Sequence, residues 1–188
     1  MREAVEKSLQ RLQLGYVDLY YLHFPDNETP FVDSVGELVR LKNEGKIREI
    51  GISNVSLEQL KEANEHGDIS VLQSPYNMLD RSAELELIPY CMENNISFIP
   101  YGPLAFGLLG GEFKRDSKLD DQDWRNSVPF FLGEPFQKTL NIVDKLKEFA
   151  AQKETSLPNL ALAWLLAQEG VGAVIPGGKR KERIHENI

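Results

Sequence analysis

"IREIGISNVSLEQL" (residues 47–60) contains the pattern that decides the fold. Its first six residues are mostly apolar and predict a buried strand. Ser56, followed by Gln59 three positions later, is a capping-box signature, in which each side chain satisfies a backbone N–H of the other residue at the first turn of a helix. The stretch therefore predicts a strand that leads through a short polar turn into a helix, which is one β-α unit.

The same alternation recurs along the chain. Apolar runs predict five strands, at residues 16–22, 47–52, 69–73, 96–101 and 171–175. Helical spacing of apolar residues predicts helices around residues 5–12, 32–44, 57–63, 82–94, 135–153 and 158–169, and a further helix begins near the C-terminal end. Repeated β-α order demands a parallel sheet with helices outside it. Because the strand runs are apolar on both faces, we expect a sheet buried on both sides.

Three details of these helices follow from the same pattern. Gly15 is expected to end the first helix, because glycine adopts the left-handed cap conformation at little cost. In the helix at 82–94, Leu85 and Ile88 are expected to face inward together with Cys91 or Met92. The helix at 158–169 is expected to present an apolar stripe made of Leu160, Ala163, Trp164 and Ala167.

Two architectures fit this order, an open doubly wound sheet and a (β/α)8 barrel of the TIM type. No G-x-G-x-x-G follows any strand, which weakens a doubly wound dinucleotide-binding domain. Polar residues cluster where strands end, and this is the face that carries the active site in barrels. Since the chain has about five strands and a barrel needs eight, residues 1–188 are expected to form a single α/β domain equivalent to strands 4–8 of a barrel.

Composition narrows the classes of partner. The formal net charge of -8 and the pI of about 5.0 argue against nucleic acid or an anionic membrane, since both require a cationic face. The single cysteine, Cys91, excludes an internal disulfide and fits a cytoplasmic location. No apolar run is long enough for a transmembrane helix. The three histidines lack the spacing of metal ligands, so no metal site is predicted.

The polar residues at the strand ends are candidates for a site, and each has a structural alternative. His23 directly follows a strand, and it is either a packing residue or a group aimed at a substrate. Ser53 and Asn54 are good N-cap residues, but Ser56 competes for that role and would leave them available to a ligand. Gln73 is either a satisfied structural amide or, beside Asn54, a partner for a planar carboxamide.

Two glycine-rich segments add to these candidates. Tyr101 ends a strand, where its ring is either core or a surface that stacks on a flat heterocycle, and residues 102–134 then form one long connection of the kind that is usually functional. "PGGKRKERIHEN" (residues 176–187) places two glycines and a basic cluster at a helix N-terminus. Positive charge there opposes the helix dipole, so the cluster is either a solvated charge run or a site for a phosphate such as a 2′-phosphate.

Five motifs in order resemble the aldo-keto reductase family, and they span essentially the whole chain. They are "YVDLYYLHFPD", "GKIREIGISN", "VLQSPYN", "YGPLAFGLLGGEF" and "IPGGKRKERIHENI". The resemblance is strongest to a bacterial branch related to the reductases of inositol-utilisation clusters. It implies a (β/α)8 barrel that binds NADP(H) and transfers hydride to the carbonyl of a small aldehyde or ketone.

The resemblance also implies roles for individual residues. His23 matches the histidine of the catalytic tetrad and would orient the carbonyl. The residues that match the nicotinamide-carboxamide contacts are Ser53, Asn54 and Gln73, and Tyr101 matches the ring that stacks on the nicotinamide. The residues that match the pyrophosphate loop are Gly102, Pro103, Leu104, Gly107 and Leu108. The residues that match contacts to the 2′-phosphate and the adenosine are Gly178, Lys179, Arg180, Arg183, Glu186 and Asn187.

One departure from the family pattern bears on activity. The Asp, Tyr and Lys of the tetrad belong to the first three βα units, which we expect to be absent from this chain. Tyr16, Tyr20 and Tyr21 precede His23 too closely to replace the tyrosine, which is the general acid. The alternative is therefore that the chain is a non-catalytic module that binds a nicotinamide cofactor or has a regulatory role. An open barrel would also leave strand edges unpaired, so self-association is expected.

Overall fold

A computed structural model describes residues 1–26, 28–178 and 181–187, with Arg183 and Glu186 described for their backbone only. The chain divides into two compact units. The first comprises Met1–Ser74 and Ala83–Ile99, and the second comprises Pro75–Ser82 and Pro100–Ile188.

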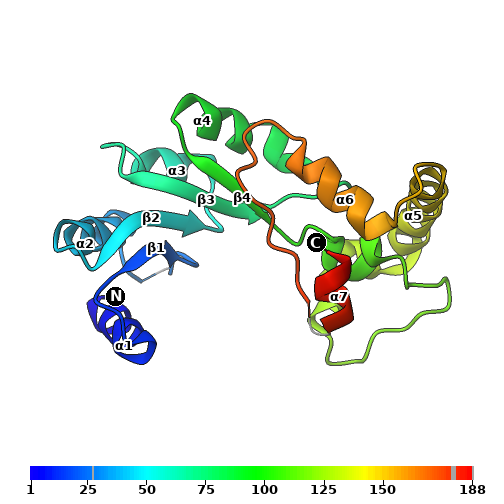
Figure 1. Ribbon diagram of the computed structural model, residues 1–188, viewed down its shortest axis with the longest axis horizontal. Helices are drawn as coiled ribbons and strands as arrows, with labels where there is room; N and C mark the ends of the chain where they lie inside the picture. The colour runs from blue at the N-terminus through cyan, green and yellow to red at the C-terminus, as the bar shows by residue number, and fades with distance from the viewer. Residues whose placement is uncertain (27, 179–180, 188) are drawn as a thin grey trace. The chain divides into compact units, whose positions relative to one another are not determined.

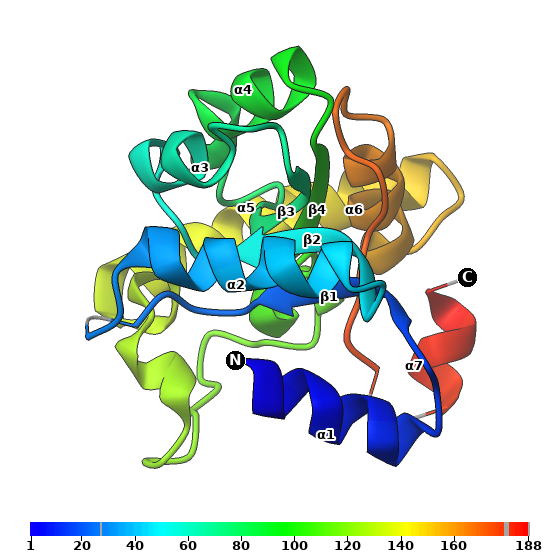
Figure 2. The same ribbon diagram turned by 90° about the vertical axis from the view of Figure 1, so that its left-hand side faces the viewer.

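A parallel sheet organises the first unit (Figure 1). Its four strands lie in the order β1 (Val17–Leu22), β2 (Ile47–Ser53), β3 (Ile69–Pro75) and β4 (Ser97–Tyr101), and the β1–β2 and β2–β3 pairs are parallel. Helix α1 (Arg2–Leu12) precedes β1, and the helices between the strands are α2 (Phe31–Asn43), α3 (Leu57–Ala63) and α4 (Leu87–Glu93), with a short η1 (Ser82–Glu84) before α4. Figure 2 shows α2 lying along the sheet, and α2 packs on β2 and α3. The predicted parallel β-α order is confirmed for these four strands.

Burial of the strands differs from the expectation of two covered faces. Ile50 to Ser53 of β2 are buried without interruption, as predicted. In β3, however, Leu72 and Ser74 are buried while Val71 and Gln73 are only half-buried, and β1 has no fully buried residue. Helices cover one face of the described sheet, and the other face is partly exposed. The β1 edge is unpaired within the described sheet, so self-association through it stays a prediction.

Local signals set the helix ends. The capping box of α3 is confirmed, with the Gln59 N–H donating to Ser56 Oγ at 3.3 Å and the Ser56 N–H donating to Gln59 Oε1 at 3.0 Å. The first helix ends two residues earlier than expected, because Gln13, not Gly15, takes the left-handed cap conformation at φ 57°. The expectation for Leu85 is also wrong. It lies in a turn and is 81% exposed, whereas Ile88 and Cys91 are buried as predicted.

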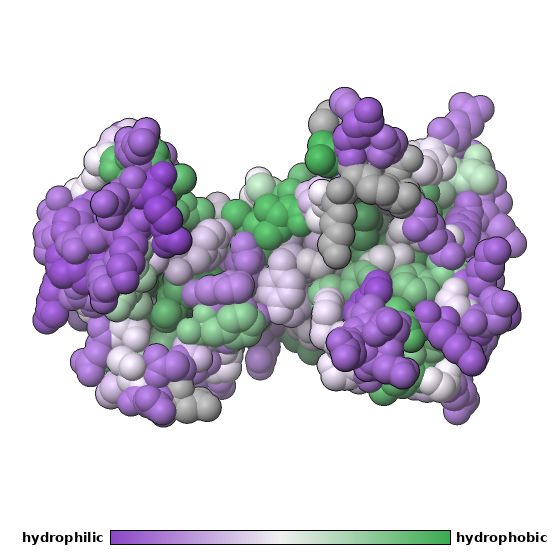
Figure 3. Space-filling model, turned by 90° about the horizontal axis from the view of Figure 1, so that it is seen from below, coloured by the Kyte–Doolittle hydropathy of each residue, from purple (hydrophilic) through white to green (hydrophobic). Residues whose placement is uncertain are grey.

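The second unit is built on a helical core. Its elements are η2 (Ala105–Gly110), η3 (Trp124–Ser127), η4 (Pro129–Phe131), α5 (Gly133–Gln152), α6 (Leu157–Leu166) and α7 (Lys181–Glu186). Side chains of η2, α5 and α6 form one buried cluster that includes Leu108, Leu109, Phe136, Leu140 and Ala161. The hydropathy of one face of the molecule is shown in Figure 3. Of the described helices, none has the length and apolar character needed to cross a membrane.

Two predictions for this unit are wrong. The expected strand at 171–175 is an isolated bridge at Val171 followed by irregular backbone, because a strand forms only where a neighbour supplies ladder hydrogen bonds, and the described sheet ends at β4. The expected stripe on α6 is wrong in part. Leu160 packs against the core and Trp164 is half-buried, but Ala163 and Ala167 are exposed. The fully buried residues of α6 are Leu157, Ala161, Leu162 and Leu165.

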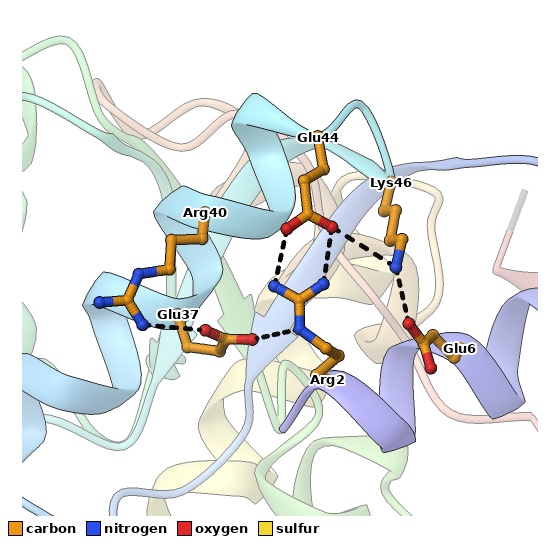
Figure 4. A network of polar contacts seen from close by, with 6 residues as sticks. All are labelled: Arg2, Glu6, Glu37, Arg40, Glu44 and Lys46. Atoms are coloured by element: carbon orange, nitrogen blue, oxygen red, sulfur yellow. Dashed lines mark hydrogen bonds and ion pairs between the residues drawn. The ribbon is translucent and has the colours of Figure 1, made fainter.

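An ion-pair network holds α1 against α2 (Figure 4). The Arg2 guanidinium forms a two-pronged contact with Glu44, at 2.6 and 2.8 Å, and its Nε lies 2.9 Å from Glu37 Oε1. Lys46 Nζ continues the network to Glu6 at 2.6 Å. Since Val5 is the only described residue of α1 that is fully buried, we infer that these charges supply much of the attachment of α1.

Acid is expected to weaken this network between pH 4.5 and about 2. Hydrogen bonding to Arg2 lowers the pKa of Glu44 from 4.5 to about 2, and hydrogen bonding to Lys46 lowers the pKa of Glu6. A carboxylate with a lowered pKa in the folded state contributes stability above its ordinary pKa, and that contribution is lost as the pH falls toward the folded-state value. Glu44→Gln should therefore flatten the fall of the thermal unfolding midpoint across this window, measured by circular dichroism. Glu93→Gln on α4 is the control, and equal slopes for both variants would contradict the inference.

Candidate functional site

The ends of β1, β2 and β3 bring four predicted site residues to one edge of the first unit. His23 directly follows β1, and Ser53, the last residue of β2, is in register with Gln73 of β3. Asn54 takes the left-handed conformation at φ 58°. This turns its amide back along the edge, where Nδ2 donates to the His23 backbone carbonyl at 2.9 Å and to Ser53 Oγ at 3.0 Å. Asn54 thus ties the end of β1 to the end of β2.

The side chains at this edge differ in their exposure. The His23 ring is exposed and meets the Phe24 ring edge-on at 4.8 Å between centroids. Ser53 is fully buried, and Asn54 and Gln73 are half-buried. Ser56 caps α3, as the sequence predicted, so Ser53 and Asn54 are not used as that cap. The edge therefore presents an imidazole beside half-buried amides, which can orient a carbonyl group and bind a carboxamide.

Tyr21, which the sequence analysis set aside, also belongs to this edge. Its side chain is hydrogen-bonded to that of Gln73, two strands away. Burial raises the pKa of the Tyr21 hydroxyl, with the Gln73 hydrogen bond acting in the opposite direction, so the hydroxyl is protonated at neutral pH. No spacing along the chain could have revealed this contact, because it depends on the register of three strands.

Tyr101 begins the candidate region of the second unit. It is half-buried, and burial together with the negative charge of Asp80 raises the pKa of its hydroxyl. The turn after it is anchored by Asn77, whose Nδ2 donates to the Gly102 carbonyl at 3.1 Å. Gly102 has φ 62°, and the ring of Phe106 lies where a Cβ would stand, 3.0 Å from that position. Glycine is therefore required at this turn.

A cavity of about 690 Å³ follows this turn. It is lined by Gly102, Pro103, Leu104, Phe106, Gly107, Gln122, Asp123, Trp124, Arg125, Ile175, Gly177 and Gly178. Five predicted cofactor-binding residues thus lie on one cavity, from two segments more than 60 positions apart. Leu108 does not line it, because its side chain is fully buried in the core behind it, and any contact it makes with a ligand would come from its backbone.

Among the described residues that line this cavity, Asp123 and Arg125 are the charged ones, and the sequence analysis missed both. Arg125 Nη2 lies 2.6 Å from Asp123 Oδ2, and its Nη1 donates to the Phe106 carbonyl at 3.1 Å. The Asp123 carboxylate raises the pKa of Arg125, which is therefore always charged. The only signal in the sequence was a short D-W-R run within the long loop. Trp124, which is 59% exposed, meets the Phe106 ring edge-on at 4.9 Å between centroids.

The C-terminal candidates are only partly described. Lys179 and Arg180 lie outside the described residues, and so do the side chains of Arg183 and Glu186, whose backbones belong to α7. Gly178 lines the cavity, and a Cβ there would lie 2.8 Å from Ile184 Cγ1. Asn187 follows α7 and is half-buried, with its N–H donating to the Ile184 carbonyl at 3.3 Å.

Comparison with known proteins finds a family whose model matches the whole chain. The family model described as "Aldo/keto reductase family" matches residues 1–188. The chain is 36% identical to the "NADH-specific methylglyoxal reductase" of Escherichia coli (strain K12), covering 100% of this chain and 58% of that protein. It is 35% identical to the "Aldo-keto reductase yakc [NADP(+)]" of Schizosaccharomyces pombe, covering 100% and 56%. The chain thus spans little more than half the length of these curated relatives.

Two solved structures are also similar to this chain over nearly its whole length, and it covers little more than half of each of them. The glycerol dehydrogenase AKR11B4 from Gluconobacter oxydans matches with a TM-score of 0.92 at 34% identity, covering 98% of this chain and 56% of that one. The thermostable aldo-keto reductase Tm1743 matches with a TM-score of 0.75 at 29% identity, covering 98% and 58%. The α/β fold with a parallel sheet, of the TIM-barrel type, is therefore shown by these neighbours, whereas the count of five βα units is not.

Proposed function

This chain belongs to the aldo/keto reductase family, and from that premise we propose that it supplies cofactor-binding residues and one catalytic residue for the NADPH-dependent reduction of aldehydes or ketones to alcohols. Because the chain spans little more than half the length of its relatives, the activity of the whole protein is part of the proposal. The observation that carries it is the Asn54 amide, which links the His23 carbonyl to Ser53 at one strand edge.

The strand-end residues of the first unit have the chemistry that this reaction needs. His23 is exposed and would orient the substrate carbonyl through a ring nitrogen. Asn54 and Gln73 carry amides, which can both donate to and accept from a nicotinamide carboxamide, and Ser53 Oγ is held beside them by Asn54. The nicotinamide cofactor would supply the hydride.

The cavity of the second unit fits the phosphate-bearing part of such a cofactor. Its volume of about 690 Å³ is within the usual range for cofactor sites. Gly102, Gly107 and Gly178 bring backbone close to a ligand without side chains in the way, and the Arg125 guanidinium, which is paired with Asp123, lines the same cavity. The adenosine contacts would involve Arg183, Glu186 and Asn187, and Tyr101 would stack on a flat ring.

The choice of NADPH over NADH rests on Lys179 and Arg180 in the sequence. Among the relatives, one is named as NADH-specific and another carries NADP(+) in its name, so both cofactors occur in the family. A basic pair directly after two glycines and before a helix suits a 2′-phosphate, which NADH lacks. We therefore propose NADPH for this chain.

Replacing both cations, Lys179→Ala with Arg180→Ala, is expected to weaken NADPH binding by tenfold or more, on the order of what loss of charged hydrogen bonds costs. NADH binding should change less than about twofold, because only the 2′-phosphate is affected. Titration of the intrinsic tryptophan fluorescence with each cofactor measures both affinities. Lys145→Ala on α5 with Lys153→Ala at the C-cap of α5 is the matched control for loss of two charges. Equal losses for NADH and NADPH would contradict the NADPH assignment.

The alternative, a non-catalytic module that binds a nicotinamide cofactor, predicts binding without turnover. Oxidation of NADPH measured with a panel of small aldehydes and ketones, alongside the same titration, separates the two functions. No fluorescence change at millimolar NADPH or NADH would contradict both. The single, buried cysteine is consistent with the cytoplasmic location that forms part of the proposal.

A further inference from the structure

Tyr21 is placed across the sheet in an unusual way. On the β1–β2 ladder it is the direct partner of Gly51. A Cβ built on Gly51 would lie 2.5 Å from both Cδ1 and Cε1 of the Tyr21 ring and 3.0 Å from Cζ. The ring therefore lies against the backbone of β2 and occupies the space that a side chain at position 51 would need. The Tyr21 ring thus lies over β2 at the position of Gly51.

The hydroxyl of Tyr21 reaches the third strand, where the side chain of Gln73 is hydrogen-bonded to it. The register explains the reach, because Gly51 pairs with Val71 and Ser53 pairs with Gln73 on the next strand. A ring that lies over Gly51 therefore points toward β3 near Val71, two residues before Gln73. The contact joins three neighbouring strands of the first unit, all within one compact body.

This contact restrains a flexible side chain. The Gln73 side chain has three rotatable bonds, and its amide can present either oxygen or NH2 to a ligand. A hydrogen bond to Tyr21 occupies one end of that amide and leaves the other end pointing in one direction. The Tyr21 ring itself lies against the backbone of β2, and preorganised support of this kind strengthens binding by reducing the ordering that a ligand must impose.

We propose that Tyr21 is a positioning residue that holds the Gln73 amide in one orientation for the carboxamide of a nicotinamide cofactor. The inference rests on the proposed function, which assigns Gln73 to that carboxamide. Gly51 belongs to the same arrangement, because only a residue without a side chain leaves room for the Tyr21 ring over β2. Tyr21 acts through Gln73 and takes no part in the chemistry.

Tyr21→Phe is the variant that tests this. Phenylalanine keeps the ring over Gly51 and removes only the hydroxyl. Tyr20→Phe is the matched control, since successive residues of a strand point to opposite faces. We expect Tyr21→Phe to weaken binding of NADPH and NADH about fivefold, the effect of one lost hydrogen bond, with binding of ADP-ribose unchanged because it lacks the nicotinamide. A purely structural role would weaken all three ligands together.

A double-mutant cycle gives a second readout. In a Gln73→Leu background, Tyr21→Phe should cost no further affinity for NADPH, because the group it positions is gone. Unchanged NADPH binding by Tyr21→Phe, equal losses for ADP-ribose, or full additivity with Gln73→Leu would each overturn the inference while leaving the proposed function in place. A wild-type chain that binds neither NADPH nor NADH would instead overturn the proposed function, and the inference with it.

Discussion

Replacing Gly51 by alanine is expected to lower the free energy of unfolding by about 1–3 kcal/mol, the usual cost of forcing an extra carbon into a packed site. The new Cβ would lie 2.5 Å from two carbons of the Tyr21 ring, well inside contact distance. The ring is held between the β2 backbone and Gln73, so the clash is relieved only by moving the ring. Urea denaturation followed by circular dichroism measures the change through its midpoint.

Gly36→Ala is the control, because Gly36 lies inside α2 and a Cβ there would meet nothing within 4 Å. That substitution is expected to raise stability by about 0.5–1 kcal/mol, since alanine is the better helix former. Tyr21→Ala, which removes the ring, should also remove most of the loss of stability caused by Gly51→Ala. A Gly51→Ala variant as stable as the wild type, or one not rescued by Tyr21→Ala, would contradict the packing described for this strand pair.

The prediction for Gly51 depends on information that the sequence could not supply. Capping and strand periodicity are local, and for that reason the start of α3 and the positions of β1 to β4 could be predicted. The contact between Tyr21, Gly51 and Gln73 depends on how three strands align, and register is set by the assembled sheet. The sequence therefore shows a glycine inside "IREIGI", but it could not predict that the Tyr21 ring requires a glycine there.

The errors have physical causes of the same kind. Helix α6 is apolar nearly all round, so its periodicity could not decide which face is buried, and packing on α5 and η2 decided it. Residues 171–175 have the composition of a strand, but a strand needs a neighbour to pair with. At the site, polar residues next to strand ends could be found from spacing, whereas Asp123 and Arg125 come from a loop without periodicity.

Arg125 is where the second large effect is expected. Its guanidinium makes several hydrogen bonds to the Asp123 carboxylate, between 2.6 and 3.1 Å, and lies over the rings of Phe113 and Phe131 at 5.6 Å from each centroid. It also donates to the carbonyl of Phe106, a residue other than glycine held at φ 55°. Arg125 therefore joins two of the three segments that line the cavity, and it holds the Phe106 backbone in a conformation that costs energy by itself.

Arg125→Met is expected to destabilise the chain by about 1.5–3 kcal/mol, the range for hydrogen bonds to a charged group, and to weaken NADPH binding by more than tenfold. Arg115→Met is the matched control, because Arg115 is exposed and contacts Asn141 and Asp144 at 2.8 and 3.1 Å without lining this cavity. An exposed pair of that kind contributes only about 0–1 kcal/mol. If the two variants lose equal stability and equal affinity, Arg125 does not hold the cavity together. If Arg125→Met loses stability but keeps NADPH affinity, the cavity is not where the phosphates bind.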